Sequence, residues 1–103
     1  MNIEVKILRN DQRRPAGKLA DAEIHFIGGE LEGLKLVGFA IWERRDGNGR
    51  NVTFPARQFN VHGDRRNFAL LRAIANPNAQ DRVRELVLKA YDEQEQSPVR
   101  AVS

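Results

Sequence analysis

The chain has 103 residues, a formal net charge of +3, 30% charged residues and no cysteine. This length predicts one domain that buries a core, and the lack of cysteine excludes disulfides, thiolate chemistry and cysteine-ligated zinc. The first ten residues interleave charged and apolar side chains and no apolar run approaches the about 20 residues that span a bilayer, so we expect a cytoplasmic protein without a signal peptide.

Alternating apolar and polar residues predict two strands at the start of the chain. Residues 3–7 alternate apolar with charged side chains, which is typical of a half-buried strand. Residues 19–27 place alternate apolar side chains on one face and Asp21, Glu23 and His25 on the other. A segment with proline and glycine separates the two stretches, so we expect a turn between them.

The most hydrophobic segment, residues 34–43, predicts a central strand. Apolar side chains fall on both of its faces, which is typical of a strand that is buried on both sides. We expect the helix of the domain on one side and a second copy of the protein on the other. One face is formed by Leu36, Ala40 and Trp42, and the other by Val37, Phe39 and Ile41.

Turn residues divide the middle of the chain into short segments. A Gly-rich turn at 46–49 allows the chain to reverse, and a return strand at 52–54 ends at Pro55, which has no N–H to donate. We expect a loop at 58–63, before the turn residues Gly63-Asp64, and a short fifth strand at 67–71.

A C-terminal helix is predicted from its start residues and its periodicity. Asn76 is a good N-cap, and Pro77 suits the first helical position. The apolar stripe that follows has helical spacing and consists of Val83, Leu86, Val87, Ala90 and Tyr91. The predicted fold is therefore α+β: an antiparallel β-sheet meander of about five strands with a C-terminal amphipathic helix packed on one face. We expect a single domain over residues 1–95 and a flexible tail over 96–103.

The charge is distributed unevenly along the chain. Residues 1–43 and 73–103 each have a formal balance of −1, whereas residues 44–72 have a balance of +5. All seven basic residues of this middle block are arginines, and the planar fork of arginine suits phosphate and carboxylate groups. The alternative is a solvated basic loop region, since charge alone does not identify a partner.

The arginines predict a surface that binds nucleic acid or an acidic partner. Some gather at the turn of the hairpin formed by residues 34–54, which we call the central hairpin. Others follow Pro55 or lie on or beside the predicted fifth strand, and one lies at the positively polarised start of the helix. The candidate nucleic-acid-binding residues are Arg44, Arg45, Arg50, Arg57, Arg65, Arg66 and Arg82.

Three phenylalanines are interleaved with these arginines. Phe54 and Phe68 lie at strand spacing, so we expect them in the core. Phe59 lies in the polar loop, so it is the candidate for an exposed ring that stacks on a base.

The sequence offers no catalytic constellation. His25 and His62 have no second ligand at metal spacing, and the paired carboxylates occupy turns and the end of the helix. The Gly-containing turn at 47–49 is not a phosphate loop, because a strand follows where such a loop needs Gly-Lys-Ser/Thr and a helix. We expect a protein that is not an enzyme and has no cofactor, no metal ion, no small-molecule substrate and no membrane contact.

Several segments resemble the stage V sporulation protein G (SpoVG, septation regulator) family. IEVKILR is similar to its first strand, and VRELVLKAY is similar to its helix. The most specific segment is GNGRNVTFPAR, where Pro55-Ala56-Arg57 matches a proline–small–basic tripeptide, and Arg66 matches an arginine in the next strand. The chain departs from the family pattern at Asn67, at Leu70-Leu71 and at Gln80.

The resemblance implies a small dimeric regulator that has a swapped or paired β-strand and binds DNA, and RNA in some members. It implies nucleic-acid contacts for Arg57, Arg66 and Arg82. We therefore expect a regulatory protein that binds DNA, and RNA as a second possibility, through an arginine-rich surface of a homodimer. The alternative is a protein-interaction subunit that binds an acidic partner protein.

Overall fold

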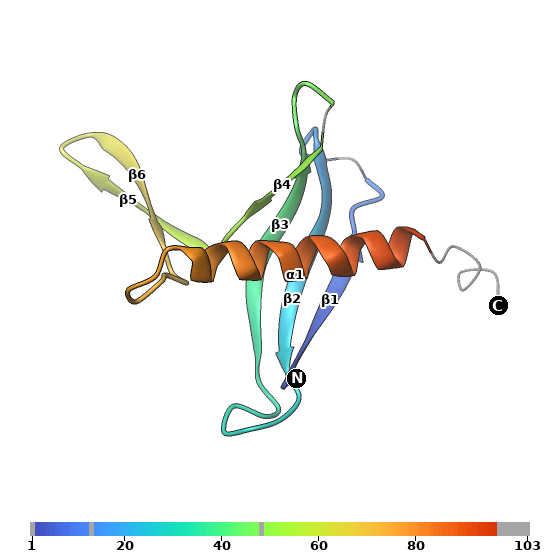
Figure 1. Cartoon of the computed structure of the whole chain (residues 1–103). Helices are drawn as coiled ribbons and strands as arrows, with labels where there is room; N and C mark the ends of the chain where they lie inside the picture. Colours follow the sequence, from blue (N-terminus) through green and yellow to red (C-terminus); the bar gives the residue numbers. More distant parts are fainter. Residues whose placement is uncertain (1, 13, 48, 97–103) are drawn as a thin grey trace.

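The computed structural model describes residues 2–12, 14–47 and 49–96, and the fold is α+β (Figure 1). The strands β1 to β4 form one antiparallel sheet in the order β1-β2-β3-β4, and β5 and β6 form a second sheet of two strands. The helix α1 packs on the four-stranded sheet. The elements are β1 (Ile3–Arg9), β2 (Lys18–Phe26), β3 (Lys35–Glu43), β4 (Arg50–Thr53), β5 (Ala56–Val61), β6 (Asp64–Ala69) and α1 (Asn78–Glu95).

The core lies between the four-stranded sheet and α1, which crosses the strands (Figure 1). The apolar face predicted for residues 19–27 is confirmed, because the side chains of Ala20, Ala22 and Ile24 are buried there. The most completely buried large side chains each contribute about 1.5–3 kcal/mol to the free energy of unfolding; they are Phe39, Ile41 and Val87.

Strand β3 contains a bulge that changes which side chains face the helix. Ala22 pairs with Phe39 and Ile24 pairs with Leu36, so three steps along β3 match two steps along β2. The bulge contains Gly38, whose φ is +110°. Leu36 therefore packs against the core together with Phe39, and its predicted place on the face of Ala40 and Trp42 is wrong.

The expected burial of both faces of β3 is met only in part within this chain. On the face away from the helix, Ala40 is buried and Trp42 is half-buried. Trp42 donates a hydrogen bond from Nε1 to the hydroxyl of Thr53 at 3.0 Å. Val37, in the bulge, is 50% exposed.

The prediction of a loop at 58–63 is wrong, because these residues belong mostly to a β-hairpin. Strand β5 pairs with β6 from Ala56↔Ala69 to Val61↔Asp64, and together they form a two-stranded ribbon that stands apart from the main sheet (Figure 1). Most side chains on both of its faces are exposed. Half-buried strands are identified in a sequence by alternating apolar and polar residues. A ribbon that is exposed on both faces does not need this alternation, so its strands are not recognised in the sequence.

The start of α1 follows the expected chemistry of Asn76 and Pro77. The side-chain oxygen Oδ1 of Asn76 accepts a hydrogen bond from the backbone N–H of Asn78 at 3.0 Å, and Pro77 already has helical dihedral angles. The helix ends at Glu95, and the tail expected over 96–103 lies outside the described residues beyond Gln96. No helix in the described part of the chain has the length and apolar character needed to cross a membrane.

Candidate nucleic-acid interface

One face of the β5–β6 ribbon carries two arginines and two phenylalanines in an alternating arrangement. Arg57 lies directly opposite Phe68, and Phe59 lies directly opposite Arg66. Because directly opposed residues share a face of an antiparallel pair, all four side chains stand on the same side of the ribbon. We call this set, Arg57, Phe59, Arg66 and Phe68, the ribbon face.

The local sequence fixes the register that produces the ribbon face. The two strands are joined by His62 and Gly63, whose φ values of 52° and 86° are both positive, as in a two-residue hairpin turn of type I′. At the other end, the N–H of Leu70 donates a hydrogen bond to the carbonyl oxygen of Pro55 at 2.9 Å. A shift of β6 by one residue would move both Arg66 and Phe68 to the other side of the ribbon.

The charges of the ribbon are available to a ligand. Three arginines and one aspartate lie between Ala56 and Ala69, a formal balance of +2. Within the part of the chain that the structure describes, Arg57, Arg65 and Arg66 have no carboxylate partner, and all three are exposed. An arginine that is paired with a carboxylate must break that pair before it binds a phosphate. Arg57, Arg65 and Arg66 need only to lose their bound water.

The phenyl rings of the ribbon face are open to solvent. Phe59 is 39% exposed and Phe68 is 47% exposed. The guanidinium carbon of Arg72 lies 4.6 Å from the centroid of the Phe68 ring, a cation–π contact. Arg72 therefore adds a further positive charge beside the ribbon face.

Of the two phenylalanines that we expect in the core, Phe54 is there and Phe68 is not. Phe54 packs against the core and meets Phe39 edge to face, with 5.2 Å between ring centroids. Phe68 is exposed, so its predicted place in the core is wrong. Its strand belongs to the ribbon, which no other element among the described residues covers. The apolar and polar pattern around Phe68 does not distinguish such a strand from one that faces the core.

Arg50, a candidate from the central hairpin, is engaged within the protein. Its guanidinium pairs with the carboxylate of Asp92 and lies 4.8 Å from the centroid of the Tyr91 ring. Burial raises the pKa of Tyr91, as does Glu95, and the charge of Arg50 opposes this rise. Arg50 thus ties β4 to the C-terminal half of α1.

The other candidate arginines lie on separate parts of the molecule. Arg44 and Arg45 are exposed in the turn between β3 and β4, and Arg44 lies 4.0 Å from a carboxylate oxygen of Asp46. Arg65 is directly opposite Asn60, so it stands on the reverse side of the ribbon. Arg82 lies on α1 beside a shallow apolar hollow. Of the seven candidates, the structure brings together Arg57 and Arg66 on one face.

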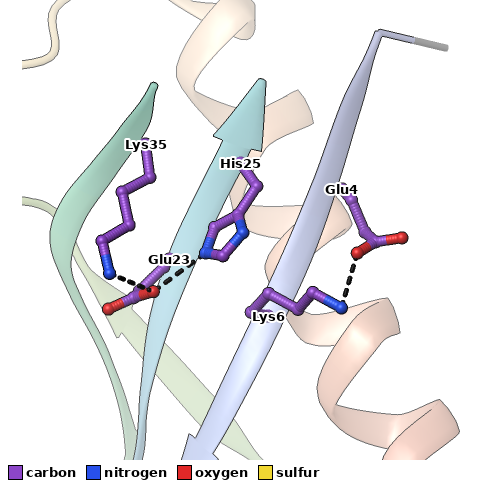
Figure 2. A network of polar contacts seen from close by, with 5 residues as sticks. All are labelled: Glu4, Lys6, Glu23, His25 and Lys35. Atoms are coloured by element: carbon purple, nitrogen blue, oxygen red, sulfur yellow. Dashed lines mark hydrogen bonds and ion pairs between the residues drawn. The ribbon is translucent and has the colours of Figure 1, made fainter. Parts of the chain in front are cut away.

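The open face of the main sheet carries a network of charged groups (Figure 2). Oε1 of Glu23 lies 2.9 Å from Nε2 of His25 and 3.3 Å from Nζ of Lys35, and Lys6 pairs with Glu4 at 2.6 Å. The hydrogen bond from His25 is the main cause that lowers the pKa of Glu23, and Lys6 likewise lowers the pKa of Glu4. His25 and Glu23 lie on the same face of β2, as the alternation of residues 19–27 predicts.

Two other features bear on metal binding and on the binding of small molecules. Within residues 2–12, 14–47 and 49–96, no three His, Asp or Glu side chains converge in an arrangement that holds a metal ion. A polar hollow lies where the end of β1, the start of β2 and the C-terminal part of α1 meet, and its lining mixes acids and bases such as Glu43, Glu95 and Arg9. In that hollow Arg9 lies 3.5 Å from Glu95, so these charges are largely satisfied by each other.

Comparisons of the chain with protein-family models, with curated proteins and with solved structures found no match. The resemblance in sequence to the stage V sporulation protein G family therefore stays a prediction.

Proposed function

We propose that this protein is a cytoplasmic regulatory protein that binds nucleic acid, DNA or RNA, through the ribbon face. The observation that carries the proposal is the juxtaposition of Arg57 and Arg66, both without a carboxylate partner among the described residues, with the exposed rings of Phe59 and Phe68. Phosphate groups suit the guanidinium forks, and nucleobases suit the rings. A nucleic acid is a ligand that offers both.

The charge of the ribbon face supplies affinity and little base recognition. Arginine contacts to phosphate position a nucleic acid without reading its sequence, and each contact releases counterions, so binding weakens as salt rises. Arg72 beside the ribbon face, and Arg65 and Arg82 elsewhere on the chain, add positive charge that steers a polyanion toward the protein. We expect no catalytic turnover.

A homodimer is the assembly that we propose for this function. Exposed apolar side chains remain in the connection between β6 and α1, where Leu70 is 60% exposed and Ile74 is fully exposed, and in the bulge of β3, where Val37 is 50% exposed. A second copy that covers these residues would remove their contact with water. A two-fold axis would also present two copies of the ribbon face to one ligand. The resemblance to a family of dimeric regulators points the same way.

The experiment that tests this proposal is fluorescence anisotropy with labelled oligonucleotides of mixed sequence at low salt. We expect Arg57→Ala and Arg66→Ala each to weaken binding at least about threefold, because each removes one phosphate contact. Arg14→Ala is the matched control, since Arg14 is an exposed arginine in the β1–β2 connection, on a different part of the molecule. Equal effects of all three substitutions would reject the ribbon face as the site. No binding of any oligonucleotide at low salt would reject the function and favour an acidic protein partner.

A further inference from the structure

The two sides of the β5–β6 ribbon differ in chemistry. One side carries the ribbon face, with Val61 and Asp64 at the turn end of the same side, whereas the reverse side carries mainly amides and Arg65. The residues of the reverse side pair as Gln58↔Asn67 and Asn60↔Arg65. Amides and arginine are the groups that read base edges in the major groove of a duplex, while exposed aromatic rings are the groups on which unpaired bases stack. The two sides therefore predict different nucleic acids.

We propose that the ribbon face binds single-stranded nucleic acid in preference to duplex, with bases stacked on Phe59 and Phe68 and phosphates held by Arg57 and Arg66. This inference rests on the proposed function of the same site. A base in a duplex is covered on both faces by its neighbours, so a protein ring can stack on it only after the duplex is distorted. In a single strand the faces of the bases are free, and the ring meets them at no such cost.

The two rings and the two guanidinium groups alternate at the corners of one square on the ribbon face. Phe59 lies opposite Arg66, and Phe68 lies two residues beyond Arg66 on β6. The two rings are therefore diagonal neighbours on one face. Diagonal neighbours in an antiparallel pair are about 7–8 Å apart. The two arginines occupy the other diagonal of the same square, so each ring has a guanidinium directly beside it to hold a phosphate.

The two rings are not equivalent. Arg72 covers part of the Phe68 ring at 4.6 Å from its centroid, so a base that stacks there meets a ring already in contact with a cation. Phe59 has no cation or aromatic ring over it among the residues that the structure describes. We therefore assign the larger share of stacking to Phe59.

The test compares a 20-nucleotide thymidine oligomer with a 20-base-pair duplex, both at the same low salt, by anisotropy. We expect the single strand to bind at least about tenfold more tightly, and Phe59→Leu to weaken its binding by about tenfold and to weaken duplex binding by much less. Phe59→Trp is expected to retain the affinity, and its added indole fluorescence to be quenched on binding, relative to the wild-type protein with Trp42 alone.

Asn60→Ala and Gln58→Ala are the matched controls, because these residues flank Phe59 on the same strand and lie on the reverse side. Thermal unfolding of each variant establishes that the ribbon mutants are folded. Equal affinity for both oligonucleotides, or an unchanged affinity of Phe59→Leu, would overturn the inference and leave the proposed function standing. A duplex preference that Asn60→Ala removes would overturn the inference and move the binding site to the reverse side of the ribbon. Failure to bind either oligonucleotide would overturn both.

Discussion

Gly38 and Pro55 are in close contact, and this contact joins the β3 bulge to the origin of the ribbon. A Cβ atom on Gly38 would lie 2.8 Å from Cβ of Pro55 and 3.3 Å from its Cα. Pro55 is buried, and its carbonyl oxygen accepts the hydrogen bond from Leu70 that closes the ribbon. The absence of a side chain at Gly38 therefore lets the chain pass from β4 to β5 against the sheet.

Gly38→Ala is expected to destabilise the protein by about 2–4 kcal/mol. The new methyl group would press on buried Pro55, and the φ of +110° at this position is strained for any residue with a Cβ. Gly47→Ala is the control, since Gly47 also has a positive φ, of 74°, but a methyl group there would meet no atom of the described residues within 4 Å. Urea unfolding of both variants measures the difference, and equal losses would show that packing against Pro55 contributes nothing.

The contact of Arg50 with Asp92 and Tyr91 is expected to stabilise the fold and to leave nucleic-acid binding unchanged. Both charged side chains are partly exposed, 39% and 47%, so a double-mutant cycle with Arg50→Ala and Asp92→Ala should give a coupling of only about 0.5–1 kcal/mol. The affinity of Arg50→Ala for an oligonucleotide is expected to match the wild type, unlike that of Arg57→Ala. A larger loss of affinity for Arg50→Ala would move the site to the central hairpin.

The carboxylate of Glu23 is expected to make stability depend on acid pH. His25 and Lys35 hold the pKa of Glu23 below its ordinary value of 4.5 in the folded protein. The unfolded chain therefore binds a proton first as the pH falls, so the contribution of Glu23 is complete above about pH 5 and is lost as the pH falls through the lowered pKa. Glu23→Gln should flatten this loss below about pH 5, measured by urea unfolding at a series of acid pH values.

Glu30→Gln is the matched control for this pH experiment. Glu30 is exposed in the connection between β2 and β3, and the substitution makes the same change of charge outside the network. A Glu23→Gln variant that loses stability with acid as steeply as the wild type would show that the contacts with His25 and Lys35 do not stabilise the folded state.

Much of the main sheet and the helix could be predicted from the sequence, because their side chains are sorted by a buried face. The alternation through Ala20, Ala22 and Ile24 and the helical stripe that includes Val87 and Tyr91 both reflect burial in one core. The bulge at Gly38 could not be predicted in the same way. It follows from the contact with Pro55, which lies 17 residues further along the chain.

The candidate site was harder to predict, because it depends on pairing and not on burial. The exposed strands of the ribbon have no buried face, so residues 58–63 resemble a loop in the sequence and Phe68 resembles a core residue. Composition indicates a block of seven arginines, and the resemblance to a known family indicates Arg57 and Arg66 together with Arg82. Only the register, which sets Arg57 and Arg66 each opposite a phenylalanine, shows that these two share one face.

The measurement that tests the central claim most directly is the salt dependence of oligonucleotide binding by the wild type and by Arg57→Ala/Arg66→Ala. A plot of the logarithm of the binding constant against the logarithm of salt concentration has a slope of about −0.7 per phosphate contact for a single strand. We expect a steep negative slope for the wild type and a slope shallower by about 1.4 for the double variant. A wild-type slope near zero, or the same slope for both proteins, would contradict binding through the ribbon face.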